Sequence, residues 1–125
     1  MIDNNPQAVS SPEDLSRRTR AFAVRVMKLF RALPKTEEAR ILGRQVLRSG
    51  AAVAANYRSA CRARSRADFI SKIGITVEEA DETTFWLELF VDAGIVKGSK
   101  LESLMAEANE LVRIFPATRT TARSR

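Results

Sequence analysis

Apolar residues recur along this chain in steps of three and four, the spacing that predicts an amphipathic helix. The first such segment begins at Ser11, which is followed by Pro12 and, three positions on, by Asp14. Serine, proline and an acidic residue in this order are typical of a helix N-terminus. Pro34 predicts the end of this helix near residue 33. Its apolar positions are Leu15, Phe22, Val26, Leu29 and Leu33.

Three further segments predict helices over residues 36–64, 65–93 and 99–115, and each begins with Ser or Thr as a candidate N-cap. Gly94 favours the left-handed conformation that ends many helices. Pro116 predicts the end of the last one. No alternating strand pattern is present in the sequence.

The predicted helices are joined by connections of only a few residues, so neighbours along the chain must run antiparallel. The fold class expected is therefore all-α, an antiparallel up-down-up-down four-helix bundle over residues 11–116. The flanking segments carry no apolar periodicity. We expect residues 1–10 to be a disordered leader and residues 117–125 to be a disordered basic tail.

Composition agrees with a single globular domain, because 45% of the 125 residues are apolar and 29% are charged. The chain has one cysteine, Cys61, so no intrachain disulfide is possible. We expect Cys61 to be a small buried side chain at the edge of the apolar face of its helix. Neither a secretion signal nor a membrane-spanning stretch is recognised, which predicts a cytoplasmic protein.

The chain has no histidine, which excludes several kinds of catalytic and metal chemistry. Without histidine there is no His-dependent triad, no His-ligated metal and no Glu-x-x-His di-iron site. Glu79 and Glu82 form one acidic pair, which we interpret as solvated or salt-bridged. We expect no enzymatic activity, no metal, no cofactor and no small-molecule substrate.

Charge distinguishes the parts of the chain more clearly than its total of +6. Residues 36–65 hold six basic and two acidic side chains, whereas residues 66–98 hold three basic and seven acidic ones. At about 100° per residue, six arginines fall within an arc of roughly 80° on the outside of the second helix. This set, called here the arginine stripe, consists of Arg40, Arg44, Arg48, Arg58, Arg62 and Arg66.

Guanidinium groups match phosphate oxygens well, so the arginine stripe predicts a surface for RNA or DNA with little sequence preference. Arg66 belongs to it only if the helix continues straight past Ser65. No aromatic residue interrupts the stripe, so base stacking is not indicated. Two other interpretations stay open, namely a plain solvated surface and pairing with acidic residues of another helix.

The helix over residues 65–93 is apolar on two faces, and a helix of this kind must bury both. One face is core. The second face makes the helix either central in the monomer or part of a subunit interface, and we favour the interface, in which the acidic members would oppose basic residues of a partner subunit. The expected interface residues are Ile75, Glu79, Glu82, Trp86, Leu89 and Phe90.

Three ordered blocks carry a resemblance to a known family. They are the run from Gln45 to Tyr57, the run from Ala67 to Ile73 and the run from Glu79 to Glu88. Over about residues 13–115 the chain resembles the bacterial four helix bundle protein family, also called the ribosomal RNA intervening-sequence protein family. Arg48 and Asn56 stand where the family has Arg and Asn, whereas Ser59 and Glu78 depart from its usual Glu and Lys.

The resemblance implies an antiparallel four-helix bundle that assembles as a homopentamer. The accessory protein of diversity-generating retroelements is similar in fold and is a basic, nucleic-acid-binding pentamer. Two hypotheses for function follow. The first is a homo-oligomeric accessory protein that binds RNA or DNA. The second is a protein-interaction scaffold, in which the arginines pair subunits or bind a protein partner.

Overall fold

The computed structural model describes residues 11–124, which form four α-helices. These are α1 (Pro12–Ala32), α2 (Glu37–Cys61), α3 (Arg66–Asp92) and α4 (Gly98–Arg123). The all-α fold class and the four-helix bundle are thereby confirmed. The leader expected over residues 1–10 lies outside the described residues, as does Arg125.

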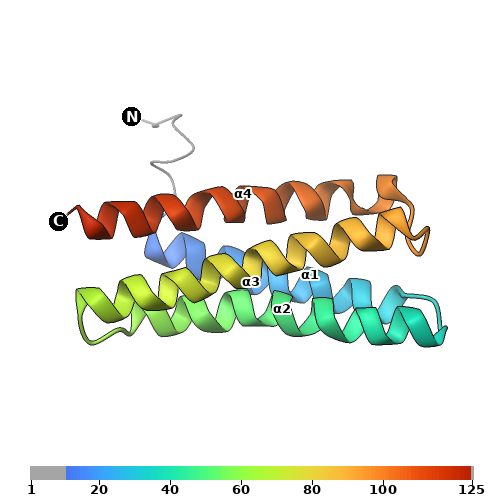
Figure 1. Ribbon diagram of the computed structural model, residues 1–125, viewed down its shortest axis with the longest axis horizontal. Coiled ribbons are helices and arrows are strands. Elements are labelled where there is room, and N and C mark those ends of the chain that lie inside the picture. Colours follow the sequence, from blue (N-terminus) through green and yellow to red (C-terminus); the bar gives the residue numbers. More distant parts are fainter. Residues whose placement is uncertain (1–10, 125) are drawn as a thin grey trace.

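Consecutive helices run antiparallel and lie side by side, with α3 between α2 and α4 and with α1 behind them (Figure 1). The pairs α2–α3, α3–α4 and α1–α2 pack extensively, whereas the fourth neighbouring pair, α1 and α4, packs much less closely. Across the α1–α4 seam, Arg18 pairs with Glu107 at 2.7 Å and with Glu110 at 3.1 Å. Ion pairs between long side chains therefore connect α1 and α4, whose backbones lie too far apart for extensive packing.

Side-chain caps set the starts of the first three helices. Ser11 accepts a hydrogen bond from the Asp14 amide, Thr36 from the Ala39 amide and Ser65 from the Asp68 amide. These are three of the four N-caps that the sequence predicts. The fourth start differs by a residue or two, because α4 begins at Gly98 after Lys97 and has no side-chain cap.

Gly94 ends α3 as its place in the sequence predicts. Its φ of 73° is in the left-handed region, where a residue without a Cβ meets no steric penalty. The amide of Ile95 donates to the Phe90 carbonyl at 2.9 Å, and the Gly94 amide donates to the Val91 carbonyl at 3.0 Å. This pair of bonds satisfies carbonyls that the helix end would leave free.

One continuous hydrophobic core runs the length of the bundle and receives side chains from every helix. Its large members have almost no exposed surface, and each such side chain contributes about 1.5–3 kcal/mol through burial. None of the described helices is long and apolar enough to cross a membrane. The largest fully buried apolar side chains are Phe22, Val26, Val46, Val53, Ile73, Leu87, Phe90, Leu111 and Phe115.

Two predicted helix ends are wrong. Helix α2 ends at Cys61 rather than near residue 64, because residues 62–65 make the turn into α3. Helix α4 does not end at Pro116 but continues to Arg123. The segment from residue 117 to 123, expected to be disordered, is therefore helical.

Packing explains why Pro116 does not stop the helix. Proline costs the helix one hydrogen bond and some steric strain, about 3 kcal/mol in an isolated helix. On the bundle side of this segment Phe115 is fully buried, and Thr118, Arg119 and Ala122 are half-buried. The Thr118 hydroxyl donates to the Ile114 carbonyl at 3.0 Å. Packing along this face offsets the cost of proline.

Candidate nucleic-acid interface

The arginine stripe follows the outward face of α2, since the opposite face packs against α1 and α3. Five of its members are exposed and form no ion pair with another residue in the part of the chain that the structure describes. They retain their full charge for an external anion. These five are Arg40, Arg44, Arg58, Arg62 and Arg66.

The geometry of the stripe differs from the prediction at one end. The chain turns at residues 62–65, so Arg66 is the first residue of α3 rather than a continuation of α2. The stripe is thus straight from Arg40 to Arg62 and bends there. Arg64 lies in the turn itself and is exposed, which adds a cation to the six that helical periodicity predicts.

Arg48 is the one member of the stripe with acidic partners. Its Nη1 donates to Glu79 Oε2 at 3.1 Å, and its Nη2 donates to Glu82. The indole nitrogen of Trp86 donates to Glu82 Oε2 at 3.0 Å. Glu79 and Glu82 are therefore salt-bridged within the chain, as one of the two interpretations of this pair has it, and their contact with basic residues of a partner subunit stays a prediction.

The hydrogen bonds in this cluster stabilise the charged forms of Arg48 and Glu82. The hydrogen bonds to Glu79 and Glu82 raise the pKa of Arg48. The hydrogen bond from Trp86, followed by that from Arg48, lowers the pKa of the Glu82 carboxyl. Arg48, Glu79 and Glu82 therefore form a charged group with an excess of one negative charge, and Arg48 is less able than its neighbours to attract phosphate.

The expected interface residues divide into an exposed and a buried group. Ile75 is 42% exposed, and Trp86 and Leu89 are half-buried. Phe90 is 0% exposed within the single chain, which corrects its assignment to an outward face. The reason is that α3 packs against both α2 and α4, so its buried arc is wide enough to include Phe90.

Sequence reasoning missed several apolar residues that the structure leaves exposed, among them Phe85 and Ile41. Phe85 is 52% exposed and packs edge-on against Trp86, with ring centroids 4.9 Å apart. Ile41 of α2 is 51% exposed. A signal existed for Phe85, because it shares a heptad position with the exposed Glu78 and Asp92.

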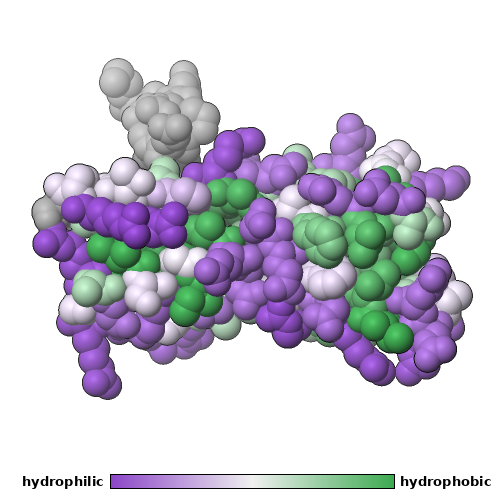
Figure 2. Space-filling view, viewed as in Figure 1, coloured by the Kyte–Doolittle hydropathy of each residue, from purple (hydrophilic) through white to green (hydrophobic). Residues whose placement is uncertain are grey.

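The outward face of α3 is otherwise acidic, in contrast to the basic face of α2. Figure 2 shows hydrophobic surface over the end where α2 begins and α3 ends, with a hydrophilic belt beside it. The face of α3 therefore repels phosphate and suits a cationic, partly apolar partner. Its exposed acidic residues are Glu78, Asp81, Glu88 and Asp92.

Cys61 is exposed, so the expectation that it is buried is wrong. It is the last residue of α2, where the bundle opens toward the turn and neighbouring side chains no longer cover it. Within residues 11–124 no group of three or more Cys, Asp or Glu side chains is arranged to hold a metal ion.

Comparison with known proteins agrees with the resemblance noted in the sequence. The sequence model of the family described as 23S rRNA-intervening sequence protein matches residues 14–116. A crystal structure from Bacteroides thetaiotaomicron, described as a protein with unknown function from the S23 ribosomal protein family, superposes with a TM-score of 0.81. It is 32% identical and covers 87% of this chain and 97% of its own. No curated protein matches the sequence.

Proposed function

The chain belongs to the 23S rRNA-intervening sequence protein family, and from this premise we propose that it is a non-catalytic, homo-oligomeric protein that binds RNA or DNA through the arginine stripe. One observation carries the proposal. Five arginines on one side of the bundle are exposed and lack an acidic partner among the described residues. A row of unpaired guanidinium groups is the electrostatic footprint expected of a phosphate-binding surface.

Binding by this surface depends on charge more than on sequence. Each phosphate that is neutralised releases condensed counterions, so affinity falls steeply with salt. The stripe presents guanidinium groups alone, which bind the phosphates of any sequence, so contact with the nucleic-acid backbone is favoured over sequence readout. Arg48 contributes least, because Glu79 and Glu82 already neutralise it.

The test compares two variants with the same loss of charge. In the stripe variant Arg44, Arg58 and Arg62 become Gln. In the control variant Arg20, Lys28 and Arg31 of α1, which are also exposed, become Gln. Affinity for a labelled 20-nucleotide RNA is measured by fluorescence anisotropy over a range of salt concentrations.

We expect the stripe variant to bind at least tenfold more weakly, and its salt slope to decrease by about one for each phosphate that it no longer neutralises. The control variant should retain most of the affinity. Equal losses of affinity in both variants would mean that only net charge matters and that α2 has no special role. Absence of binding at low salt would refute the proposed function.

A second candidate, the protein-interaction scaffold, is favoured by the outward face of α3. Exposed Ile75 and Phe85 lie there among acidic residues, while Ile41 lies beside the arginines of α2. Exposed apolar residues surrounded by acidic residues on one face and by basic residues on another could pair two subunits, because the two faces attract each other. The expected assembly, a homopentamer by resemblance, is tested by light scattering at low and high salt.

For this scaffold, Phe85→Lys is compared with Val24→Lys, since Val24 is an exposed apolar residue of α1 at 46%. Loss of the oligomer only in the Phe85 variant would support an interface on α3. An oligomer that ignores RNA but dissociates in high salt would favour arginines that pair subunits over arginines that bind nucleic acid.

A further inference from the structure

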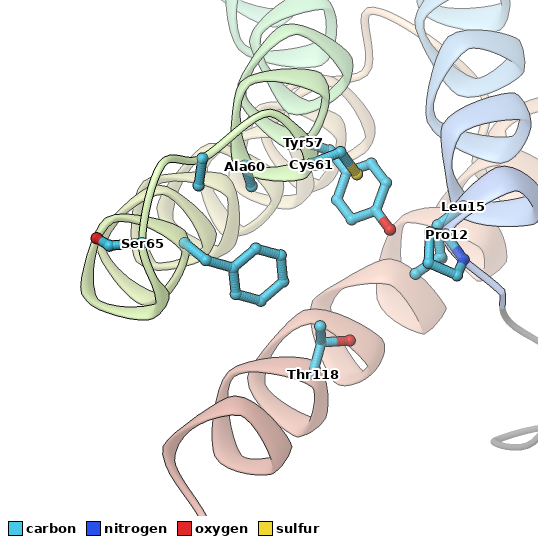
Figure 3. Close-up of a pocket in the computed structure, with 9 residues that line it drawn as sticks. Pro12, Leu15, Tyr57, Ala60, Cys61, Ser65 and Thr118 are labelled. Atoms are coloured by element: carbon cyan, nitrogen blue, oxygen red, sulfur yellow. The ribbon is translucent and has the colours of Figure 1, made fainter. Parts of the chain in front are cut away.

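A pocket of about 310 Å³ opens at the end of the bundle where α1 begins and where α2 turns into α3. Figure 3 shows side chains from all four helices around it. Leu15, Ala60 and Phe69 give it apolar walls, and Tyr57, Cys61 and Thr118 bring polar atoms to it. Its volume is at the lower end of the range of natural ligand pockets.

Tyr57 is the best-fixed polar group of this pocket. Its side chain is 2% exposed, and its ring packs against Phe115 with centroids 5.6 Å apart. In Figure 3 its hydroxyl points toward Pro12 and Leu15, across the opening. Burial and the neighbouring Cys61 raise the pKa of Tyr57 well above its usual range, so the hydroxyl keeps its proton and can donate.

Basic residues alternate along the chain with the residues that line the pocket. Arg58 follows Tyr57, Arg62 follows Cys61, and Arg64 and Arg66 flank Ser65. All four are exposed. The last turn of α4 reaches the same end of the bundle and carries Arg123 (Figure 1). Those four arginines therefore flank the lining positions along the chain at this end of the bundle, and three of them, Arg58, Arg62 and Arg66, belong to the arginine stripe.

Among residues 11–124, the acidic residues at this end are few and mostly engaged. Asp14 pairs with Arg17, and Asp68 pairs with Lys72 at 3.2 Å. Glu13 is exposed near Tyr57. The balance of charge around the opening stays strongly positive, which favours an anionic ligand.

A ligand that fits both the apolar pocket and the basic residues around it has an apolar, planar part and a chain of negative charges. We infer that the pocket receives an unpaired base of single-stranded RNA or DNA while the neighbouring phosphates lie on Arg58, Arg62, Arg64 and Arg66. This inference rests on the proposed function and adds a site to it. The base stacks on Phe69, and the hydroxyls of Tyr57 and Thr118 face its polar edge.

Duplexes are excluded from this pocket because their bases are paired and stacked on one another. They still bind to the straight part of the stripe through their phosphates. The tertiary structure thereby places an aromatic side chain at the same end of the bundle as the arginines of residues 58–66, which helical periodicity alone does not. Phe69 is seven residues beyond Arg62 in sequence, but the turn brings its ring to the pocket that Cys61 and Tyr57 line.

The first experiment compares three probes of equal length, namely a single strand, its duplex and an abasic strand that keeps the phosphates. Affinity is measured for wild type and Phe69→Ala. We expect Phe69→Ala to weaken binding of the single strand roughly tenfold and to leave binding of the duplex and the abasic strand unchanged. An equal loss of affinity for all three probes would overturn the inference.

The second experiment uses the wild-type chain and does not depend on a variant that folds. Cys61 is the only cysteine, is exposed and lines the pocket, so its alkylation by iodoacetamide reports on occupancy. We expect saturating single strand to slow alkylation at least fivefold, and duplex or abasic strand at equal saturation to have little effect. RNA and DNA strands are both tested, to show which sugar is preferred.

Binding by the arginine stripe and binding of a base in the pocket are distinguished by these results. Strong binding of all three probes with unchanged Cys61 alkylation would overturn the pocket inference and leave the arginine stripe in place. No binding of any probe at low salt would overturn both.

Discussion

The hydroxyl of Thr83 in α3 lies 2.8 Å from the hydroxyl of Ser49 in α2 and 2.8 Å from the Glu79 carbonyl oxygen of its own helix, and the two acceptors share its single proton. Both side chains are fully buried, and Ser49 in turn donates to the Val46 carbonyl of its own helix. This pair lies at the same level of the α2–α3 hairpin as the exposed cluster of Arg48 with Glu82. Polar contacts therefore fix the register of the two helices both inside and outside the core.

The first prediction concerns this buried pair. Thr83→Val removes the donor and leaves the Ser49 oxygen without it in an apolar environment, which should lower the free energy of unfolding by about 1 kcal/mol. The measurement is urea denaturation followed by circular dichroism. The matched control is Thr121→Val, since the Thr121 hydroxyl is exposed and bonds only to the Ala117 carbonyl.

Combining Ser49→Ala with Thr83→Val tests the coupling. The double variant should cost less than the sum of the single ones, because neither partner is then left unsatisfied. Strict additivity would show that the two hydroxyls do not interact.

A second prediction compares two helical glycines. A Cβ at Gly50 would lie 2.9 Å from both Cγ atoms of the buried Val26, so Gly50→Ala should destabilise the bundle by about 1–3 kcal/mol. At Gly74 the nearest atom would be Nη1 of Arg119 at 3.6 Å, an ordinary contact. Gly74→Ala should therefore stabilise by about 0.5–1 kcal/mol.

Thermal denaturation of both variants is sufficient to check this pair. If Gly50→Ala left the melting temperature unchanged, α1 and α2 would be less closely packed than the structure has them.

The third prediction is a pH dependence at Glu82. Its pKa is lowered in the folded state, so its carboxylate stabilises the fold above the ordinary value of 4.5, and this contribution disappears as the pH falls through the folded pKa. Wild type should be more stable than Glu82→Gln at pH 7, by less than about 1 kcal/mol for such an exposed pair. The difference should vanish at acid pH.

Glu88→Gln is the control for this measurement, because Glu88 is exposed and forms no ion pair within residues 11–124. Its stability should differ little from wild type at any pH. A constant deficit of Glu82→Gln down to pH 2 would indicate a packing effect instead of a charge effect.

The fourth prediction addresses the helix that continues through proline. Pro116→Ala restores a backbone donor to the Val112 carbonyl and removes the steric clash, so it should raise the stability by about 1–3 kcal/mol. Pro12→Ala, at the first position of α1, should be nearly neutral, because no helical hydrogen bond is available there. Lower stability of Pro116→Ala would mean that packing of the ring outweighs the restored hydrogen bond.

Local signals accounted for most of the fold. Ser11, Thr36 and Ser65 were readable as N-caps because a capping bond involves residues only three positions apart. Gly94 was readable for the same reason. Pro116 was misleading because its local cost is real, but the packing that outweighs it comes from residues far away in sequence, on α2 and α3.

The candidate site was only partly predictable. A stripe of arginines on α2 follows from helical periodicity alone, and its exposure agrees. The pairing of Arg48 with Glu79 and Glu82 was not predictable, since it depends on the register of α2 against α3. Phe90 was placed on the wrong face because the width of a buried arc depends on how many neighbours a helix has.

Composition and periodicity by themselves determined the four helices, the antiparallel order and the basic face of α2, since each depends on residues within one or two turns of one another. Only the tertiary structure decided which cations stay unpaired, where α4 ends, and that Tyr57, Cys61, Phe69 and Thr118 surround one pocket. The pocket joins residues far apart in the chain, from Leu15 to Thr118. They come together only when hydrophobic burial assembles all four helices.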